Sequence, residues 1–185
     1  MKIISFVNRK GGCGKSSLVC LLALYWGERK GRRVAITDQD SQGSSEAFVL
    51  HRESPNITLY EEGGEYDYVL IDTPGGISSR ELSSIVSLSD LIIIPLSLSP
   101  TDIRSSAETA ELIHTPQKTR LLFNRVNTRT RAFKGKGSIA KAIGLKPLKN
   151  HLGNRVAYSY ALVEGWGALK GKSVQELTQF AEEIG

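Results

Sequence analysis

The stretch that decides the fold is Asn8–Ser17, which reads NRKGGCGKSS. Its three glycines allow tight backbone turns with positive φ values, which residues with a side chain rarely adopt. A loop of small residues that runs into a helix directs backbone N–H groups and the positive end of the helix dipole at phosphate oxygens. The stretch therefore predicts a phosphate-binding loop, although Arg9 stands where the pattern G-x-x-x-x-G-K-[ST] places its first glycine.

The segments around this loop predict alternating strands and helices. Residues 2–7 form a short β-branched and aromatic run that stops at the loop, and residues 16–30 carry apolar side chains at helical spacing. Further strands are expected at 32–37, 66–71, 91–96 and 120–126. Helices are expected at 79–88, 102–114, 138–143 and about 174–184. This order predicts an α/β fold, a doubly wound, mostly parallel sheet flanked by helices, with its ligand site at the carboxyl ends of the strands.

Length and composition predict a single domain spanning residues 1–185. No stretch of about 18 or more apolar residues is present, so we expect no transmembrane helix, and Arg9 and Lys10 interrupt the first apolar run too early for a signal peptide. The two cysteines are too few for a disulfide framework, which favours a cytoplasmic protein. Cys13 could have a lowered thiol pKa beside a helix start, but a small loop residue is the simpler interpretation.

Positive charge is concentrated in one part of the chain. The net charge is +5, yet between Glu111 and Glu164 there are eleven cations and no acidic residue, so the remainder has a net charge of −6. The eleven are Lys118, Arg120, Arg125, Arg129, Arg131, Lys134, Lys136, Lys141, Lys146, Lys149 and Arg155. The distribution predicts a polyanion-binding face contributed mainly by residues 118–155.

The loop and two aspartates suggest specific chemistry. In loops of this pattern the lysine, here Lys15, reaches the β- and γ-phosphates, and the next residue, Ser16, ligates Mg²⁺. Asp38 and Asp72 end two predicted strands and so fall at the same edge of the sheet as the loop. The loop residues expected to bind nucleotide are Gly11, Gly12, Cys13, Gly14, Lys15, Ser16 and Ser17.

The arrangement K-G-G-x-G-K-[ST], from Lys10 to Ser16, resembles the deviant Walker A loop of the ParA/MinD family of P-loop ATPases. The resemblance implies that the protein binds ATP and Mg²⁺ and hydrolyses ATP slowly. It also implies that Lys10 reaches across a nucleotide-sandwich homodimer to the phosphates of the other subunit. Charge that develops on the transferred phosphoryl group is then neutralised only when two subunits meet. By this resemblance Lys10 and Lys15 are catalytic.

Three further segments extend the resemblance. ITDQDSQGSS is similar to the family's D-x-D-P-Q-G-N motif, which implies that Asp40 positions the attacking water and that Asp38 lies near the metal through water. Ser41 stands where proline is usual, which leaves the stiffness of this switch open. YDYVLIDTPGG resembles the Walker B strand, in which Asp72 would hold Mg²⁺ through water. LLFNRVNTRTR resembles a strand end at which an asparagine, here Asn124, bonds the adenine edge.

The carboxyl-terminal segment RVAYSYALVEGWGALKGKSVQEL resembles small plasmid-partition ParA proteins, including the ParF-like type. The resemblance thus covers nearly the whole chain, except that the segment between Asp40 and Tyr66 is shorter than usual. Small ParA proteins bind non-specific DNA as ATP dimers, which implies a role for the basic run. The expected DNA-contacting residues are Arg129, Arg131, Lys134, Lys136, Lys149 and Arg155.

The resemblance implies a switch for plasmid or chromosome partitioning. ATP would drive dimerisation, the dimer would bind DNA on the nucleoid, and hydrolysis stimulated by a centromere-binding ParB-like partner would release it. A ParA-like positioner of a protein assembly fits the same residues. A MinD-like membrane regulator would need a basic amphipathic last helix, whereas residues 174–185 hold three glutamates and no cation. A biosynthetic P-loop enzyme is a further alternative, and an iron–sulfur carrier would need cluster cysteines.

Overall fold

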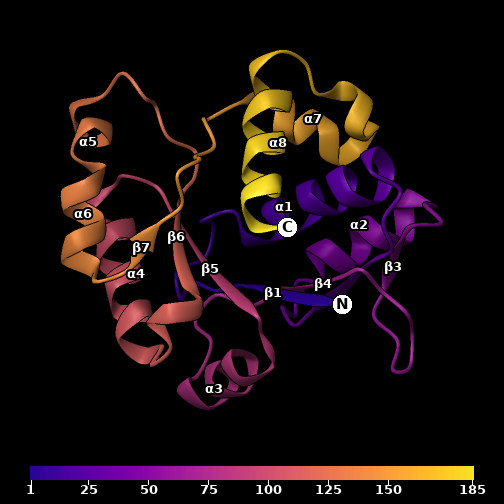
Figure 1. The fold of residues 1–185 in the computed structure, drawn as a ribbon, viewed down its shortest axis with the longest axis horizontal. Helices are drawn as coiled ribbons and strands as arrows, with labels where there is room; N and C mark the ends of the chain where they lie inside the picture. Colours follow the sequence, from indigo (N-terminus) through magenta and orange to yellow (C-terminus); the bar gives the residue numbers. More distant parts are fainter.

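The computed structural model describes residues 1–185 as a seven-stranded sheet flanked by helices on both faces (Figure 1). The strand order is β3-β2-β4-β1-β5-β6-β7, and every strand pairing is parallel. The strands are β1 (Lys2–Phe6), β2 (Val34–Asp38), β3 (Ile57–Leu59), β4 (Tyr68–Asp72), β5 (Leu91–Leu96), β6 (Thr119–Phe123) and β7 (Lys146–Pro147). The predicted α/β, doubly wound sheet is confirmed.

Eight α-helices cover the sheet. They are α1 (Lys15–Ala23), α2 (Ser44–Arg52), α3 (Ser79–Leu88), α4 (Pro100–Leu112), α5 (Arg131–Lys134), α6 (Lys136–Ile143), α7 (Val156–Glu164) and α8 (Lys172–Ile184). Short 3₁₀ helices occupy Pro116–Lys118 and Trp166–Ala168. None of the helices is long and apolar enough to cross a bilayer.

The hydrophobic core has two main parts, one on each face of the sheet. Side chains of α1 and α8 pack on one face, and side chains of α3, α4 and α6 pack on the other. In β5, Ile93 belongs to the first cluster, whereas Ile92 and Ile94 belong to the second. Because successive residues of a strand point to opposite faces, a strand covered on both sides needs a continuous apolar run.

The position of β1 locates the ligand site. β1 is hydrogen-bonded to β4 on one side and to β5 on the other, and the chain leaves it toward β2 first and crosses to β5 later. In open α/β sheets the crevice at such a reversal, outside the carboxyl ends of the strands, is where ligands bind. The loop that follows β1 is the glycine-rich stretch 8–17.

Several elements differ from the sequence predictions. The helix expected over 16–30 is α-helical only to Ala23 and continues as a π-helix over Leu24–Arg29. A Cβ on Gly27 would stand 2.4 Å from the Ile57 side chain, so a glycine is required where this turn packs on β3. The sequence did not predict α2, β3, α5, β7 or α7. The shortened segment after Asp40 nevertheless holds one helix and one strand.

Candidate nucleotide site

The loop between β1 and α1 has the backbone expected for phosphate binding. Gly12 and Gly14 have φ values of 77° and 95°, a conformation that side chains resist. A Cβ on Gly14 would also stand 2.7 Å from the amide nitrogen of Asn124. No side chain caps the start of α1, and no acidic residue lies in its first turn. Arg9 has no positive φ, which explains why the usual first glycine is not needed.

Lys15 is held inside the loop. Its side chain is almost fully buried, and its Nζ donates to the carbonyl oxygens of Asn8 at 3.1 Å and Lys10 at 3.3 Å. The neighbouring Cys13 is also buried, and burial raises the pKa of its thiol. The structure therefore agrees with the interpretation of Cys13 as a small loop residue rather than a reactive thiolate.

Asn8, which the sequence analysis did not single out, anchors the loop. It is fully buried, and its Nδ2 donates to the carbonyl of Pro95 at 2.9 Å and to the hydroxyl of Ser106 at 3.1 Å. Its Oδ1 accepts from the backbone N–H of Lys10 at 3.0 Å. A polar residue directly after a buried strand was the available signal, because a buried amide has to be fully hydrogen-bonded.

The side chain of Lys10 points away from the phosphate-binding loop and toward α4. Its ammonium forms an ion pair with Asp102 in the first turn of α4 and donates to Thr101 Oγ1 at 3.0 Å. Asp102 also accepts a hydrogen bond from Ser97. Partial burial acts to raise the pKa of Asp102, but these hydrogen bonds and the Lys10 charge hold it below its usual value. Within one chain, Lys10 is thus fastened to α4.

Asp72 is a buried carboxylate that makes no hydrogen bond with the protein. It ends β4, is fully buried, and neither of its oxygens is hydrogen-bonded. Burial raises its pKa to about 6, although the nearby hydroxyls of Ser16 and Ser45 act to lower its pKa. A buried carboxylate of this kind is unfavourable unless a cation or water compensates it, so the position fits a role beside Mg²⁺.

The side chains around Asp72 fit an Mg²⁺ ion that is bound mainly by nucleotide and water, rather than a metal ion coordinated by protein side chains alone. No group of three His, Cys, Asp or Glu side chains converges anywhere in the structure. Mg²⁺ in nucleotide sites is commonly bound by one or two protein oxygens together with phosphates and water. The Ser16 hydroxyl and, through water, Asp72 would supply the protein part.

Asp38 has a structural role that the sequence did not predict. Its Oδ2 accepts from the backbone N–H of Ser45 at 2.8 Å, from the Ser45 hydroxyl at 2.7 Å and from the N–H of Glu46 at 3.0 Å. Its Oδ1 accepts from the N–H of Asp40 at 2.9 Å. The carboxylate therefore satisfies the free N–H groups at the start of α2. A contact from Asp38 to the metal through water stays a prediction.

The phosphate cavity, as we name it, brings the loop and Asp40 together. It has a volume of about 270 Å³. Its lining residues are Gly11, Gly12, Gly14, Lys15, Ser16, Ser17, Asp40, Ser44, Gly75 and Arg125. Gly75 follows β4, and the turn that it forms with Gly76 is tied to the loop because the N–H of Gly76 donates to the carbonyl of Arg9 at 2.8 Å. Asp40 thus lines the same cavity as the phosphate-binding loop, and its role in positioning the attacking water stays a prediction.

A second cavity of about 460 Å³, which we name the base cavity, also borders the loop. Its lining includes Asn124 and, from α7, Tyr158, Ser159 and Leu162, which sequence reasoning missed. The Asn124 amide donates to the carbonyl of Cys13 at 3.0 Å, so it also supports the loop. A contact from Asn124 to the edge of a base stays a prediction.

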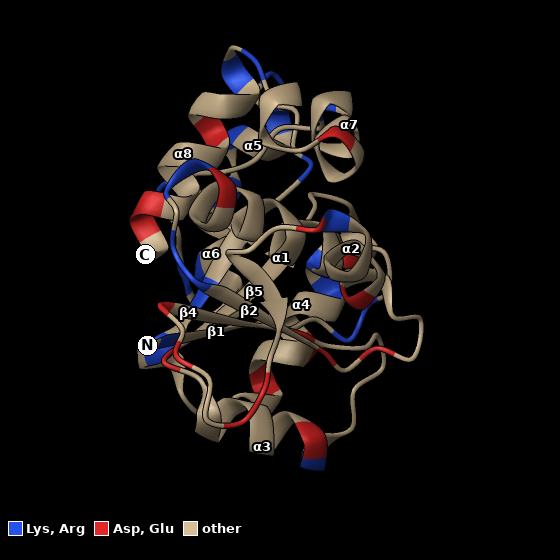
Figure 2. Ribbon diagram, turned by 90° about the vertical axis from the view of Figure 1, so that its right-hand side faces the viewer, with Lys and Arg blue, Asp and Glu red and all other residues tan.

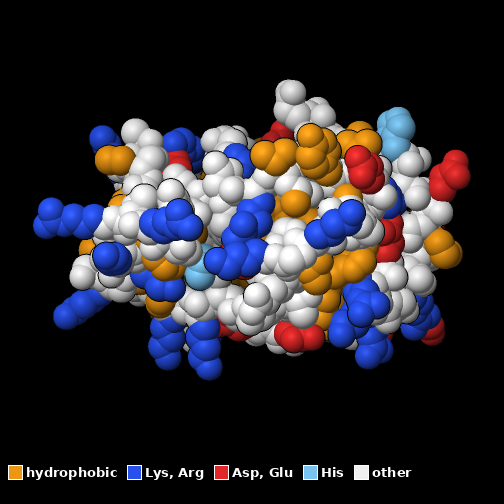
Figure 3. Space-filling model, turned by 90° about the horizontal axis from the view of Figure 1, so that it is seen from above, with side chains coloured by type: hydrophobic (Ala, Val, Ile, Leu, Met, Phe, Trp, Pro, Cys, Tyr) orange, Lys and Arg blue, Asp and Glu red, His pale blue; other side chains and the backbone are white.

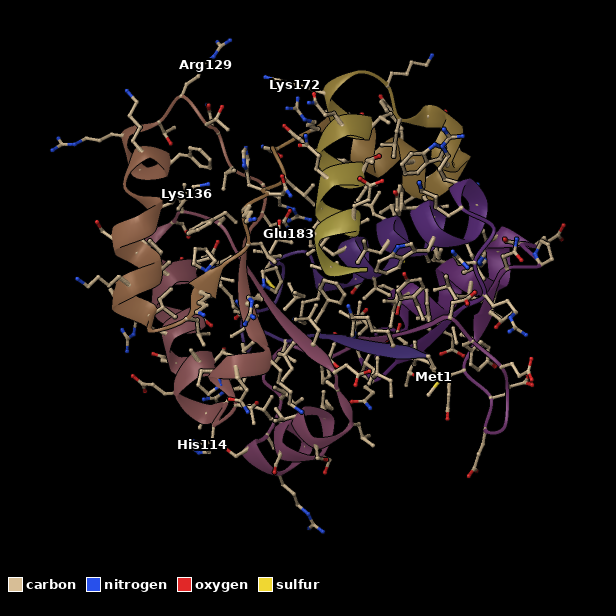
Figure 4. The ribbon with its side chains drawn as sticks, viewed as in Figure 1. Met1, His114, Arg129, Lys136, Lys172 and Glu183 are labelled. Atoms are coloured by element: carbon tan, nitrogen blue, oxygen red, sulfur yellow. The ribbon has the colours of Figure 1, made fainter.

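Four of the six predicted DNA-contacting residues, Arg129, Arg131, Lys134 and Lys136, lie in or next to α5 and at the start of α6, whereas Lys149 and Arg155 lie beside α8. Blue segments on the ribbon in Figure 2 mark Lys and Arg positions near α5 and α6. Figure 3 shows Lys and Arg side chains extending from the end of the molecule that carries α5 and α6 in Figure 1, with few acidic side chains among them. Arg129 lies in the loop before α5 and extends outward, while Lys136 lies at the start of α6 (Figure 4). The Lys136 Nζ lies 4.7 Å from the centre of the Phe133 ring.

Arg155 differs from the other residues in this set. Its guanidinium forms an ion pair with Glu176 of α8, with Nε–Oε2 and Nη2–Oε1 distances of 2.6 and 2.5 Å. Tyr158 and the N–H of Gly153 donate to the same carboxylate. The charge of Arg155 is therefore compensated within the fold by Glu176, and a contact from Arg155 to DNA stays a prediction.

Comparisons with known proteins agree with this geometry. The family model described as the CobQ/CobB/MinD/ParA nucleotide binding domain matches residues 4–165. The chain is 24% identical to the Maintenance of carboxysome distribution protein A of Halothiobacillus neapolitanus over 98% of this chain and 95% of that protein.

Two solved structures show the same fold. A putative plasmid partition protein of Borrelia burgdorferi bound to AMPPNP is 19% identical, with a TM-score of 0.75 over 98% of this chain and 97% of its own. The MinD cell division protein of Aquifex aeolicus is 16% identical, with a TM-score of 0.80 over 100% of this chain and 96% of its own.

Proposed function

The chain belongs to the CobQ/CobB/MinD/ParA family of nucleotide-binding domains, and we propose that it is a ParA-like positioning ATPase that works as an ATP-dependent homodimer on DNA. The observation that carries the proposal is the direction of Lys10. Gly11 and Gly12 line the phosphate cavity, but Lys10 does not, and its ammonium lies against Asp102 of α4. A lysine in this position would reach phosphates only in a second subunit.

The hydrolytic chemistry would be divided between two chains. Lys15 and the loop N–H groups would bind the phosphates, and Asp40, which lines the same cavity, would orient the attacking water. When bound, Mg²⁺ would neutralise charge on the phosphates. Lys10 from the second subunit would add the positive charge that stabilises the transferring phosphoryl group. Hydrolysis would therefore be slow in the monomer and would report dimer formation.

We propose that DNA is bound by the predicted basic residues that form no ion pair within the fold. Arg129, Arg131, Lys134 and Lys149 are exposed, Lys136 is half-buried, and none of the five forms an ion pair. Such side chains contact phosphates rather than bases, so the affinity should fall by about 0.9 log units per log unit of salt for each contact. The dimer would present two of these faces and associate with the nucleoid.

Two cargoes are consistent with the relatives. The similarity to a carboxysome distribution protein favours a protein assembly as cargo, and the similarity of fold to a plasmid partition protein favours a plasmid. In either case we propose a separate partner protein, of the ParB-like kind for a plasmid, that stimulates hydrolysis and releases the dimer from DNA. Retrieval of a plasmid centromere or of an assembly protein by the ATP-bound chain would distinguish the two.

The proposal is tested by DNA binding to a random-sequence duplex, measured by fluorescence anisotropy with ATP, with ADP and without nucleotide. Binding should require ATP and should be lost in Lys10→Ala. The double variant Arg129→Glu, Arg131→Glu should lose DNA binding but still dimerise with ATP. The matched control reverses two arginines outside the basic face, Arg32→Glu and Arg80→Glu. Binding that ignores both nucleotide and Lys10 would refute the proposal.

A further inference from the structure

Arg125 has a backbone conformation that arginine does not favour. It follows β6 by two residues and has a φ of 54°, one of only two positive values at non-glycine residues. Its N–H donates to Asn124 Oδ1 at 3.0 Å, and Asn124 Nδ2 in turn donates to the carbonyl of Cys13 at 3.0 Å. These bonds fix the conformation without using the Arg125 side chain. Glycine or asparagine would fit the backbone better, so a role for the guanidinium is indicated.

The guanidinium lies against the phosphate-binding loop. Its Nη1 donates to the carbonyl of Gly12 at 2.9 Å. Its Nε stands 3.5 Å from the position that a Cβ on Gly14 would take. An arginine has five N–H donors, and no acidic side chain pairs with this one. Donors therefore remain for a ligand in the loop.

Arg125 stands where the two cavities meet. The residues that line both the phosphate cavity and the base cavity are Gly12, Ser17 and Arg125. Arg125 is the only charged side chain of the three. A nucleotide whose base lies in one cavity and whose terminal phosphates lie in the other has to place its ribose and its α-phosphate at this junction.

We propose that Arg125 binds the α-phosphate of the nucleotide and so selects nucleoside 5′-phosphates over nucleosides. The assignment rests on the nucleotide site described above. The planar guanidinium keeps its bond to Gly12 and donates its remaining N–H groups to phosphate oxygens, a geometry for which arginine is well suited. The left-handed backbone holds the side chain over the loop before nucleotide arrives.

The test compares the affinities for ADP, AMP and adenosine, each measured by displacement of a fluorescent ADP analogue. In Arg125→Asn the backbone conformation remains acceptable and the guanidinium is removed. The affinity for AMP and ADP should fall by about ten- to a hundredfold, the size expected for a hydrogen bond to a charged group, while the affinity for adenosine should not change. Arg125→Lys should lie between wild type and Arg125→Asn. Arg32→Asn, next to the amino-terminal end of β2 and so away from the carboxyl ends of the strands, should bind as wild type.

Three outcomes would overturn the proposal. Wild-type affinity for AMP and ADP in Arg125→Asn would show that the guanidinium does not contact the phosphate. An equal loss for adenosine would show that Arg125 only supports the loop through Gly12. If the wild-type chain bound none of the three compounds, the nucleotide site itself would fail, and Arg125 with it. The first two outcomes leave the nucleotide site intact.

Discussion

The buried carboxyl of Asp72 makes the stability of the nucleotide-free protein depend on pH in a particular direction. Burial raises its pKa from 3.8 to about 6. Between these values the folded chain keeps a proton that the unfolded chain has lost. The stabilisation of the folded state is therefore fully present below about pH 4 and is lost as the pH rises through about 6. A difference of about two pH units corresponds to about 3 kcal/mol, of which about 2 kcal/mol should develop between pH 4 and pH 7.

Asp72→Asn removes this titration. Its amide leaves a buried polar group at every pH, a cost that is constant and cancels in the pH dependence. The free energy of unfolding of Asp72→Asn minus that of wild type should rise by about 2 kcal/mol from pH 4 to pH 7. Urea unfolding in the presence of a chelator, followed by circular dichroism at four pH values, measures this difference. Glu62→Gln, which removes an exposed carboxyl, is the control.

Parallel pH curves for wild type and Asp72→Asn would refute the reasoning, since they would mean that the fold compensates the ionised carboxylate by itself. The role of Asp72 in binding Mg²⁺ is tested by a separate measurement. At pH 7, Mg²⁺ added with ADP should stabilise wild type more than ADP alone, and this increment should be lost in Asp72→Asn. An undiminished increment would remove Asp72 from the metal site.

Three other changes probe the loop and its surroundings. In Gly75→Ala the new Cβ would stand 3.2 Å from backbone atoms of the phosphate-binding loop, so we expect a loss of about 1–3 kcal/mol in thermal melts and weaker ADP binding; unchanged ADP affinity would contradict this. Asp102→Asn releases Lys10 and should lower the dissociation constant of the ATP dimer about fivefold in sedimentation, whereas weaker dimers would show that the pair does not restrain the lysine. Hydrogen bonds from Arg155 and others lower the pKa of Glu176 despite its burial. Glu176→Gln should therefore cost about 2 kcal/mol in urea unfolding at pH 7, and the deficit should shrink as the pH falls below the ordinary glutamate pKa of 4.5 and through the lowered pKa of the folded chain; a deficit that does not shrink in this direction would refute this sign.

The sequence predicted the sheet well where apolar runs were long. The strand over Leu91–Leu96 and the helix over Ser79–Leu88 have the predicted bounds, because a strand buried on both faces and a strongly amphipathic helix leave clear patterns. It failed for α2, which buries only Ser45 and Val49, and for the three-residue β3. Elements with so little buried surface leave no periodicity to detect.

The candidate site divides in the same way. The phosphate-binding loop and Asp72 follow from local motifs, since their positions are fixed by the strands that precede them. The direction of Lys10 does not, because it depends on α4, more than eighty residues later in the chain. The compensation of Arg155 by Glu176 and the left-handed conformation of Arg125 likewise depend on contacts that only the folded chain creates.

The most direct test of the central claim, that Lys10 acts in the site of a second subunit, is ATP hydrolysis in a mixture of two inactive variants. Lys10→Ala keeps its own Asp40 and Lys15 but has no lysine to offer. Asp40→Ala can offer Lys10 but cannot orient water in its own site. We predict that neither hydrolyses ATP alone and that the mixture does, because each mixed dimer holds one complete site. A mixture as inactive as its components, or wild-type hydrolysis by Lys10→Ala alone, would contradict the account.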